Sequence, residues 1–109
     1  MVAVVENFIR LRPGIPKRLH FIDHTVVEKT IRDPLTKWPK RVRALVFRVD
    51  WEDGVSVDKQ FSVIQYKLAE QLAPYLPGKI YRDYLFEIIQ HGSGFTAEFE
   101  VKVLPWPGR

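Results

Sequence analysis

Apolar and polar residues alternate along most of this chain, which is typical of strands with one buried face. The pattern predicts strands over residues 18–32, 41–51, 55–63, 84–90 and 95–104. The last is the clearest, because one parity holds Phe95, Ala97, Phe99, Val101 and Val103. The adjacent Val26 and Val27 interrupt the alternation of the first strand, which predicts a β-bulge or strong coiling of the strand at that point.

Turn signals divide the chain. Asp53-Gly54 lies between two alternating runs and predicts a tight hairpin, because both central positions of such a turn need positive φ. Pro13-Gly14 and Pro16 separate residues 1–15, which we expect to form an N-terminal arm or edge strand, from a domain over 16–104. Residues 105–109 form a short tail.

One helix is expected, over residues 64–75, where Leu68, Leu72 and Tyr75 make an apolar stripe. Ser62 is its expected N-cap, and Pro74 with Pro77-Gly78 ends it. Three strands, a helix and two strands predict an all-β fold, a five-stranded OB-type barrel with one α-helix between strands 3 and 4. The alternative is a β-grasp sheet, with the first long strand outside it.

Charge is distributed unevenly over these 109 residues, a length typical of one domain. Residues 10–48 hold eleven Lys or Arg against three acids, a balance of +8, whereas the rest holds six against ten, a balance of −4. This favours a one-sided basic surface that attracts polyanions. The alternative is a solvated surface in which folding mixes these cations with acids from elsewhere.

The basic first half centres on residues 32–51, where Trp38 stands between Lys37 and Lys40. Cations hold phosphates and an indole face stacks on a base, so this pattern is typical of single-stranded nucleic-acid binding. A Trp packed on the barrel end or in a dimer contact is the alternative. The cations expected to hold phosphates are Arg32, Lys37, Lys40, Arg41, Arg43 and Arg48, unless cross-strand salt bridges, for instance with Glu28, occupy them.

Further contact candidates lie outside this hairpin. Trp51 and Phe61 are candidate stacking residues on the second and third strands, although their parity favours the core. His91 and Phe95 flank the turn between the fourth and fifth strands, which is the second ligand loop of an OB fold. An ordinary exposed His and a core Phe are the alternatives.

Catalytic chemistry finds little support. His20 and His24 share a strand face beside Asp23, but a zinc site needs a third ligand, so polar strand histidines are the simpler interpretation. Nucleophile elbows, phosphate-binding Gly loops and nucleotide fingerprints are absent from the sequence, and there is no cysteine. We therefore expect a non-enzyme without cofactor or metal. The N-terminal apolar run is interrupted by Glu6, so we expect no signal peptide or membrane span and a cytoplasmic location.

Residues 16–104 resemble the OB-fold single-stranded DNA-binding proteins of the small phage or prokaryotic type. The strand order, the basic aromatic hairpin and the run 55–76 carry this resemblance. It implies largely sequence-independent binding of single-stranded DNA, with RNA left open, as an accessory to replication, recombination or repair. It also implies a homo-oligomer, with a dimer expected, in the cytoplasm or, for a virus, the host cytoplasm.

One feature departs from this family. Its typical bacterial members carry a long acidic, Gly-rich C-terminal tail, whereas this sequence ends in Pro105-Trp106-Pro107-Gly108-Arg109, which favours a minimal, viral version. The alternative function is a structural or adaptor protein that uses a small β-barrel for protein–protein contacts through Phe8, Ile9 and Trp106.

Overall fold

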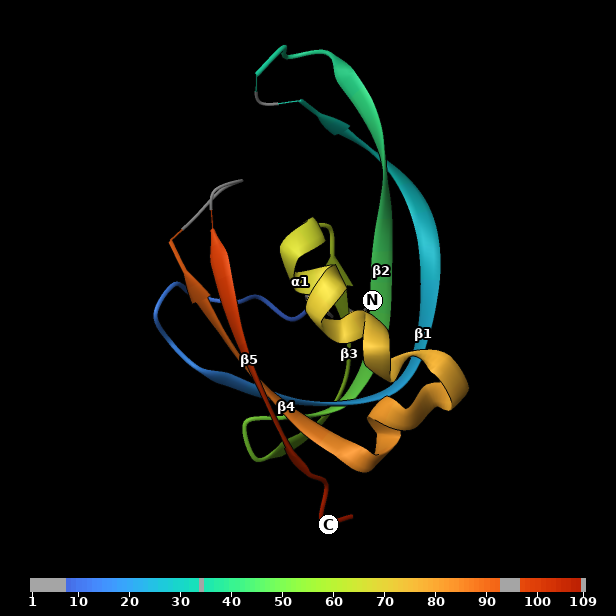
Figure 1. Cartoon of the computed structure of the whole chain (residues 1–109), viewed down its shortest axis with the longest axis vertical. Coiled ribbons are helices and arrows are strands. Elements are labelled where there is room, and N and C mark those ends of the chain that lie inside the picture. The colour runs from blue at the N-terminus through green and yellow to red at the C-terminus, as the bar shows by residue number, and fades with distance from the viewer. Residues whose placement is uncertain (1–7, 34, 93–96, 109) are drawn as a thin grey trace, which may run out of the picture.

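The computed structural model describes residues 8–33, 35–92 and 97–108. Its strands are β1 (Lys17–Arg32), β2 (Pro39–Glu52), β3 (Val55–Val63), β4 (Tyr84–His91) and β5 (Glu98–Pro105). They form one sheet in the order β3-β2-β1-β4-β5, with every neighbouring pair antiparallel (Figure 1). The predicted five-stranded, all-β architecture is confirmed at this level. Because β1 is the central strand, the β-grasp alternative is excluded.

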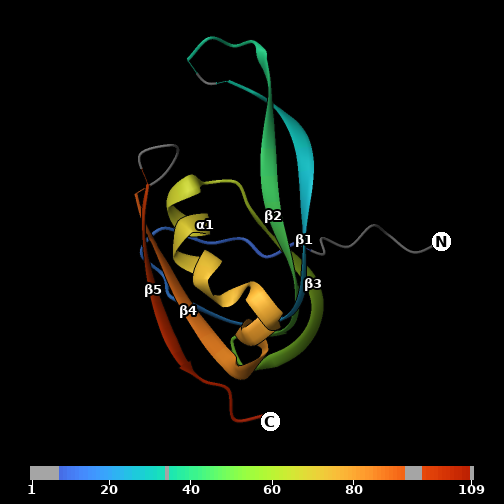
Figure 2. The same ribbon diagram turned by 45° about the vertical axis from the view of Figure 1, so that its right-hand side comes forward.

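The sheet curls around the helix α1 (Figure 2). Its two edges are β3 and β5, and these strands share no hydrogen-bonded ladder within the described residues. The sheet is therefore open along this seam, whereas the sequence predicted closure into a barrel. Residues 8–15 pass from the β3 side to β4, since Ile9 N donates to Gln60 O at 2.8 Å and Gly14 N donates to Gln90 O at 2.7 Å.

A bulge bends β1 near its start. The register between β1 and β2 shifts on both sides of Phe21, and that between β2 and β3 shifts after Val49, so the predicted bulge at Val26–Val27 is wrong. Val26 pairs with Leu45 and Val27 with Ala44 in regular register. A valine can lie on either face of the sheet at this point, so two adjacent valines do not require the extra residue of a bulge. The bend lets β1 pair with β4 over Lys17–Leu19 and with β2 along the rest of its length.

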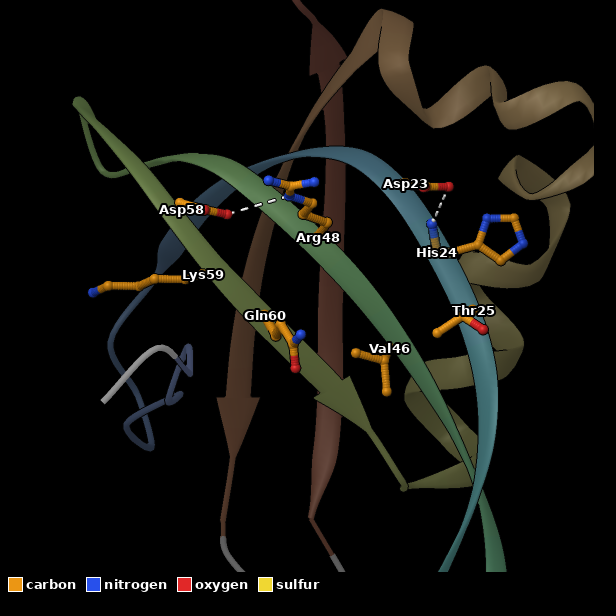
Figure 3. A pocket seen from close by; sticks show the side chains of 8 residues that line it. All are labelled: Asp23, His24, Thr25, Val46, Arg48, Asp58, Lys59 and Gln60. Carbon is orange, nitrogen blue, oxygen red and sulfur yellow. Dashed lines mark hydrogen bonds and ion pairs between the residues drawn. The ribbon is translucent and has the colours of Figure 1, made fainter. Parts of the chain in front are cut away.

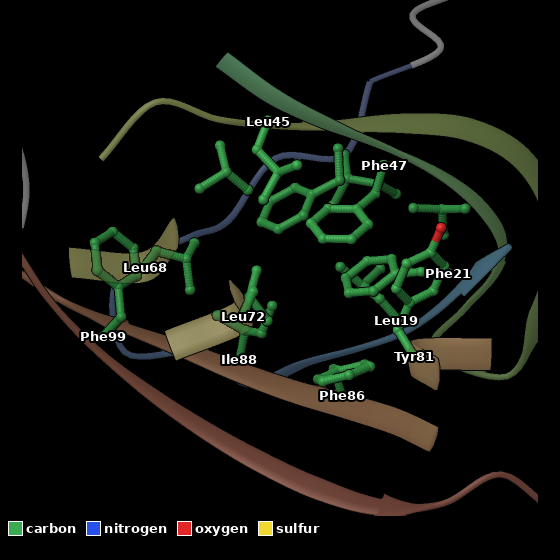
Figure 4. Close-up of a cluster of buried hydrophobic side chains, with 14 of the residues drawn as sticks. Leu19, Phe21, Leu45, Phe47, Leu68, Leu72, Tyr81, Phe86, Ile88 and Phe99 are labelled. Carbon is green, nitrogen blue, oxygen red and sulfur yellow. The ribbon is translucent and has the colours of Figure 1, made fainter. Parts of the chain in front are cut away.

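Aromatic rings make up the centre of the core (Figure 4). The Phe21 ring stacks on Phe47, with centroids 4.1 Å apart, and on Phe86 at 5.1 Å. The Tyr81 ring meets Phe47 edge-on at 5.5 Å. Such pairs stabilise the fold beyond the area that they bury. Leu68 and Leu72 of α1 complete this cluster and are each 1 % exposed, which fixes the helix on the inner side of the sheet.

The helical connection follows β3 but covers different residues from those predicted. It consists of α1 (Tyr66–Leu72) and the 3₁₀ turns η1 (Ala73–Tyr75) and η2 (Pro77–Asp83). Ser62 remains in β3, paired with Val46, so it does not cap the helix; extended Gln65 takes that place. Pro74 lacks the amide hydrogen that a further α-turn needs, so the α-helix ends at Leu72. The turn η2, which carries Tyr81 into the core, was not predicted from the sequence.

Candidate functional site

A hairpin arm extends beyond the rest of the sheet (Figures 1 and 2). β3 pairs with β2 only from Leu45 to Glu52, and β4 pairs with β1 only from Lys17 to Leu19. Residues 27–32 and 39–44 consequently pair with each other alone. We call this two-stranded part, together with the described residues of its turn, the hairpin arm. The arm carries its tip beyond the sheet body (Figures 1 and 2).

The tip of the hairpin arm is organised by Asp33. Its Oδ1 accepts hydrogen bonds from the Leu35 and Thr36 amides at 2.8 and 3.2 Å. These bonds hold the pKa of the Asp33 carboxyl below its usual value. The Asp33 carbonyl oxygen accepts a hydrogen bond from Lys37 N at 2.7 Å, and Asp33 N donates to Trp38 O at 2.9 Å. Lys37 adopts a φ of 67°. This loop holds Trp38 with 73 % of its surface exposed.

Most cations of the hairpin arm lack an acidic partner. Arg41 has one, since its Nη2 lies 3.2 Å from Glu28 Oε1, an exposed pair that contributes about 0–1 kcal/mol. Lys29 Nζ donates to Ser62 Oγ, and the charge of Lys40 acts on the Asp33 carboxyl and lowers its pKa. The side chains of Arg32, Lys37 and Arg43 are exposed and form no hydrogen bond or ion pair with a described residue. The structure therefore brings five of the six predicted phosphate-binding cations to one arm, together with Trp38.

Arg48 lies apart from these five cations. It lines a hollow on the outer face of β1, β2 and β3, and its Nε lies 3.2 Å from Asp58 Oδ1 (Figure 3). Asp23, Lys59 and Gln60 line the same hollow, so positive and negative groups are balanced there. Arg48 thus matches the salt-bridge alternative.

The other predicted contact residues are not gathered with Trp38. Phe61 is 3 % exposed in the core. Trp51 is half-buried against Trp106, with ring centroids 5.5 Å apart, and lies roughly 40 Å along β2 from the arm's tip. His91 is exposed at the end of β4, 3.3 Å from Glu100 Oε1, and this end of β4 faces the same way as the arm (Figure 1). Phe95 lies outside the described residues.

The two strand histidines have separate surroundings. The β1 bulge lies between His20 and His24, so the four-residue spacing that predicted a shared strand face does not bring them together. His20 is 5 % exposed, stacks on Trp106 at 3.9 Å, and places Nδ1 2.7 Å from Asp50 Oδ1. His24 Nδ1 instead lies 2.7 Å from the Tyr81 hydroxyl. No group of three or more potential metal ligands occurs in the part of the chain that the structure describes.

One exposed aromatic was missed by the sequence analysis. Tyr66 begins α1 with 75 % of its surface exposed, and its hydroxyl donates to Glu70 Oε2 at 3.0 Å, which raises the pKa of Tyr66. Tyr66 lies two residues before Leu68 and therefore off the apolar stripe of the helix. This offset was the sequence signal that the Tyr66 side chain would be exposed.

Three comparisons with known proteins identify no family for this chain. Protein-family models, curated proteins and solved structures were each compared with the chain, and none matches. The described residues also contain no helix of the length and apolarity that crossing a membrane requires. The geometry of the site is therefore the evidence on function.

Proposed function

We propose that this protein binds single-stranded nucleic acid through its hairpin arm, without catalysis. One observation carries the proposal: Trp38 is 73 % exposed at the tip of an arm on which the side chains of Arg32, Lys37 and Arg43 form no ion pair with a described residue. The exposed indole offers a ligand an apolar, aromatic face. Clustered cations beside it favour a ligand that is both anionic and aromatic.

Single-stranded nucleic acid has both properties. Its unpaired bases expose π-faces, and stacking on an aromatic side chain contributes about 1–3 kcal/mol per base. Its phosphates release counterions when Lys and Arg bind them. Neither interaction distinguishes one base from another, which favours largely sequence-independent binding. An accessory role in replication, recombination or repair, and assembly as a homo-oligomer, belong to the same proposal.

The arrangement of the strands supports this proposal. An OB fold is a five-stranded, partly open barrel that binds oligonucleotides with the loops between strands 1 and 2 and between strands 4 and 5. Here the strand order is β3-β2-β1-β4-β5, the helical connection lies between β3 and β4, and the seam between β3 and β5 is open. We therefore propose an OB-type barrel, in which the hairpin arm is the first ligand loop.

A second candidate is a protein-binding arm. Leu35 is 92 % exposed at the tip beside Trp38, and Val26 is 57 % exposed at the arm's base. Exposed apolar side chains on a protruding hairpin also suit a contact with another protein. The density of unpaired cations makes nucleic acid the better supported ligand.

Trp38 fluorescence tests the proposal. Titration with oligo-dT should quench the wild-type emission, and matched duplex DNA should quench it far less. Trp38→Phe keeps a stacking ring, so it should retain most of the affinity but lose the quenching. Trp38→Ala should lose both, with binding about 1–3 kcal/mol weaker.

Trp51→Phe is the matched control, because Trp51 packs against Trp106 and lies far along β2 from the tip. That variant should keep the affinity and the quenching. Unchanged affinity in Trp38→Ala, as measured by an anisotropy titration with labelled oligo-dT, would show that the hairpin tip is not the contact. Binding of a protein partner that survives excess oligo-dT would favour the second candidate.

A further inference from the structure

The two faces of the hairpin arm carry different side chains. Directly opposed residues of antiparallel strands share a face, and successive pairs alternate between faces. Val26–Leu45 and His24–Phe47 are opposed pairs, and Leu45 and Phe47 point into the core. Continuing outward on that inner face, the opposed pairs are Glu28–Arg43, Thr30–Arg41 and Arg32–Pro39. Each of these three pairs holds one arginine.

The outer face of the arm has a different composition. Its opposed pairs are Val27–Ala44, Lys29–Val42 and Ile31–Lys40. Ala44 is fully buried, and Lys29 Nζ donates to Ser62 Oγ at 3.1 Å. Lys40 forms no described hydrogen bond or ion pair, although its charge acts on the Asp33 carboxyl. Folding therefore sorts the arm into an arginine face and a mainly apolar face.

The arginine spacing suits an extended phosphate backbone. Successive pairs on one strand face are separated by two residues, which is roughly 7 Å. That distance is comparable with the separation of neighbouring phosphates in an extended single strand. Arginine binds a phosphate with two parallel hydrogen bonds, which lysine cannot do. Glu28 is the one acid on this face, and its pair with Arg41 is exposed and therefore weak.

An exposed aromatic lies on the same side of the sheet. α1 packs on the inner side through Leu68 and Leu72, and the hairpin arm curves over that side in Figures 1 and 2. Tyr66 follows β3 by three residues and is 75 % exposed. Trp38 lies at the outer end of the arm, one residue beyond the Arg32–Pro39 pair, and Tyr66 follows the strand that ends beside Leu45. An aromatic ring is thus available at each end.

We propose that the inner face of the hairpin arm is the track of the nucleic-acid backbone. Arg32, Arg41 and Arg43 each hold one phosphate, Trp38 stacks a base at the outer end, and Tyr66 stacks one at the inner end. This inference rests on the proposed function and assigns the ligand to one face of the arm. The track is short, so the site size falls near the lower end of the about 4–16 nucleotides typical of one OB fold.

Single-charge variants separate the two faces. Arg32→Gln, Arg43→Gln and Lys40→Gln each remove one exposed cation that forms no described hydrogen bond or ion pair, and Lys40 lies closer to Trp38 in sequence than Arg43 does. Each arginine variant should weaken oligo-dT binding about fivefold at 0.1 M salt, since a lost phosphate contact lowers the salt slope by about 0.7. Lys40→Gln should change affinity by less than about twofold. Circular dichroism confirms that each variant is folded.

The outcomes distinguish this inference from the proposed function. If wild-type protein binds oligo-dT but Lys40→Gln weakens binding as much as the arginine variants do, the track is not on the inner face, and the proposed function still holds. If wild-type protein does not bind oligo-dT at low salt, both fall. A larger loss in both arginine variants supports the track.

Tyr66 provides an independent test of the inner end. Tyr66→Ala should weaken oligo-dT binding by at least about fivefold, because the stacked base loses its partner. Tyr66→Phe keeps the ring and loses only the hydroxyl contact with Glu70, so it should bind like the wild type. Wild-type affinity in Tyr66→Ala would place the inner end of the track elsewhere.

Discussion

Glu52 forms ion pairs with two lysines of the sheet body, Lys17 and Lys59. Its carboxylate oxygens lie 2.5 Å from Lys17 Nζ and 2.8 Å from Lys59 Nζ, and its side chain is 13 % exposed. Burial alone would raise the pKa of Glu52, but the hydrogen bonds and charges of Lys17 and Lys59 outweigh it and hold the pKa below the ordinary 4.5. Lys17 responds in the matching direction: burial opposes its charge, yet contacts with Glu52 and Asp53 raise its pKa.

This pairing predicts an acid-dependent loss of stability. A carboxyl whose pKa is lowered by folding stabilises the protein above its unfolded pKa, and that stabilisation is lost as the pH falls through the folded pKa. Glu52→Gln should therefore lower the free energy of unfolding by about 1–3 kcal/mol at pH 7, between the exposed-pair and buried-pair ranges. The difference from wild type should shrink below about pH 4.5. Urea unfolding across pH measures it; a difference independent of pH would contradict the ion-pair origin.

At the scale of single residues, the sequence identifies candidate side chains but not the residues that they contact. Trp38 and its flanking lysines could be chosen because residue type and local spacing were enough. Arg48 could not be separated from them, because its neighbour Asp58 comes from β3 through a register that the sequence does not fix. Phe61 shows the opposite case, since parity with Val63 already indicated burial, which the structure confirms.

Among the elements, the hairpin arm depends most on its turn. Asp33 accepts two amide hydrogen bonds from within the loop that holds Trp38. Such a turn reduces the conformational freedom that the loop would otherwise lose when a ligand binds. Geometry at Asp33 should therefore matter for affinity, even though an acid beside a phosphate-binding surface is electrostatically unfavourable.

Two substitutions separate geometry from charge at Asp33. Asp33→Asn keeps an oxygen that accepts both amides and removes the negative charge, so oligo-dT affinity should equal or exceed that of wild type. Asp33→Ala removes the charge as well but loses the turn, so affinity should fall several-fold, with a stability loss of no more than about 1 kcal/mol. Isothermal titration measures both variants. Equal affinity in Ala and Asn would show that the turn does not preorganise Trp38.

The strands were predictable because alternation is a local pattern that survives folding. The Asp53-Gly54 hairpin was predictable for the same reason, and its φ angles of 50° and 93° confirm it. The bulge and the helix bounds depend on tertiary contacts instead. The bulge lies where β1 leaves β4, and the helix starts only after β3 has paired Ser62 with Val46. Neither partner is near in sequence.

Across the whole molecule, ion pairing leaves the hairpin arm as the basic surface. In the sheet body Lys17 pairs with Glu52, Arg18 with Glu87, and Arg48 with Asp58. Folding thus mixes part of the basic first half with acids from elsewhere, as the alternative interpretation expected. The arm contributes one such pair, between Arg41 and Glu28, among the described residues. Net charge alone could not have located this surface, because its position follows from which cations find partners.

The salt dependence of oligo-dT binding by the intact protein tests the central claim most directly. The three arginines that each hold a phosphate, at about 0.7 counterions per contact, predict a slope of log K against log salt near −2. Affinity should therefore be measurable at about 50 mM salt and fall steeply by about 200 mM, with duplex DNA a weaker competitor throughout. Absence of binding at low salt, or an affinity that does not change with salt, would contradict a hairpin arm that grips phosphates.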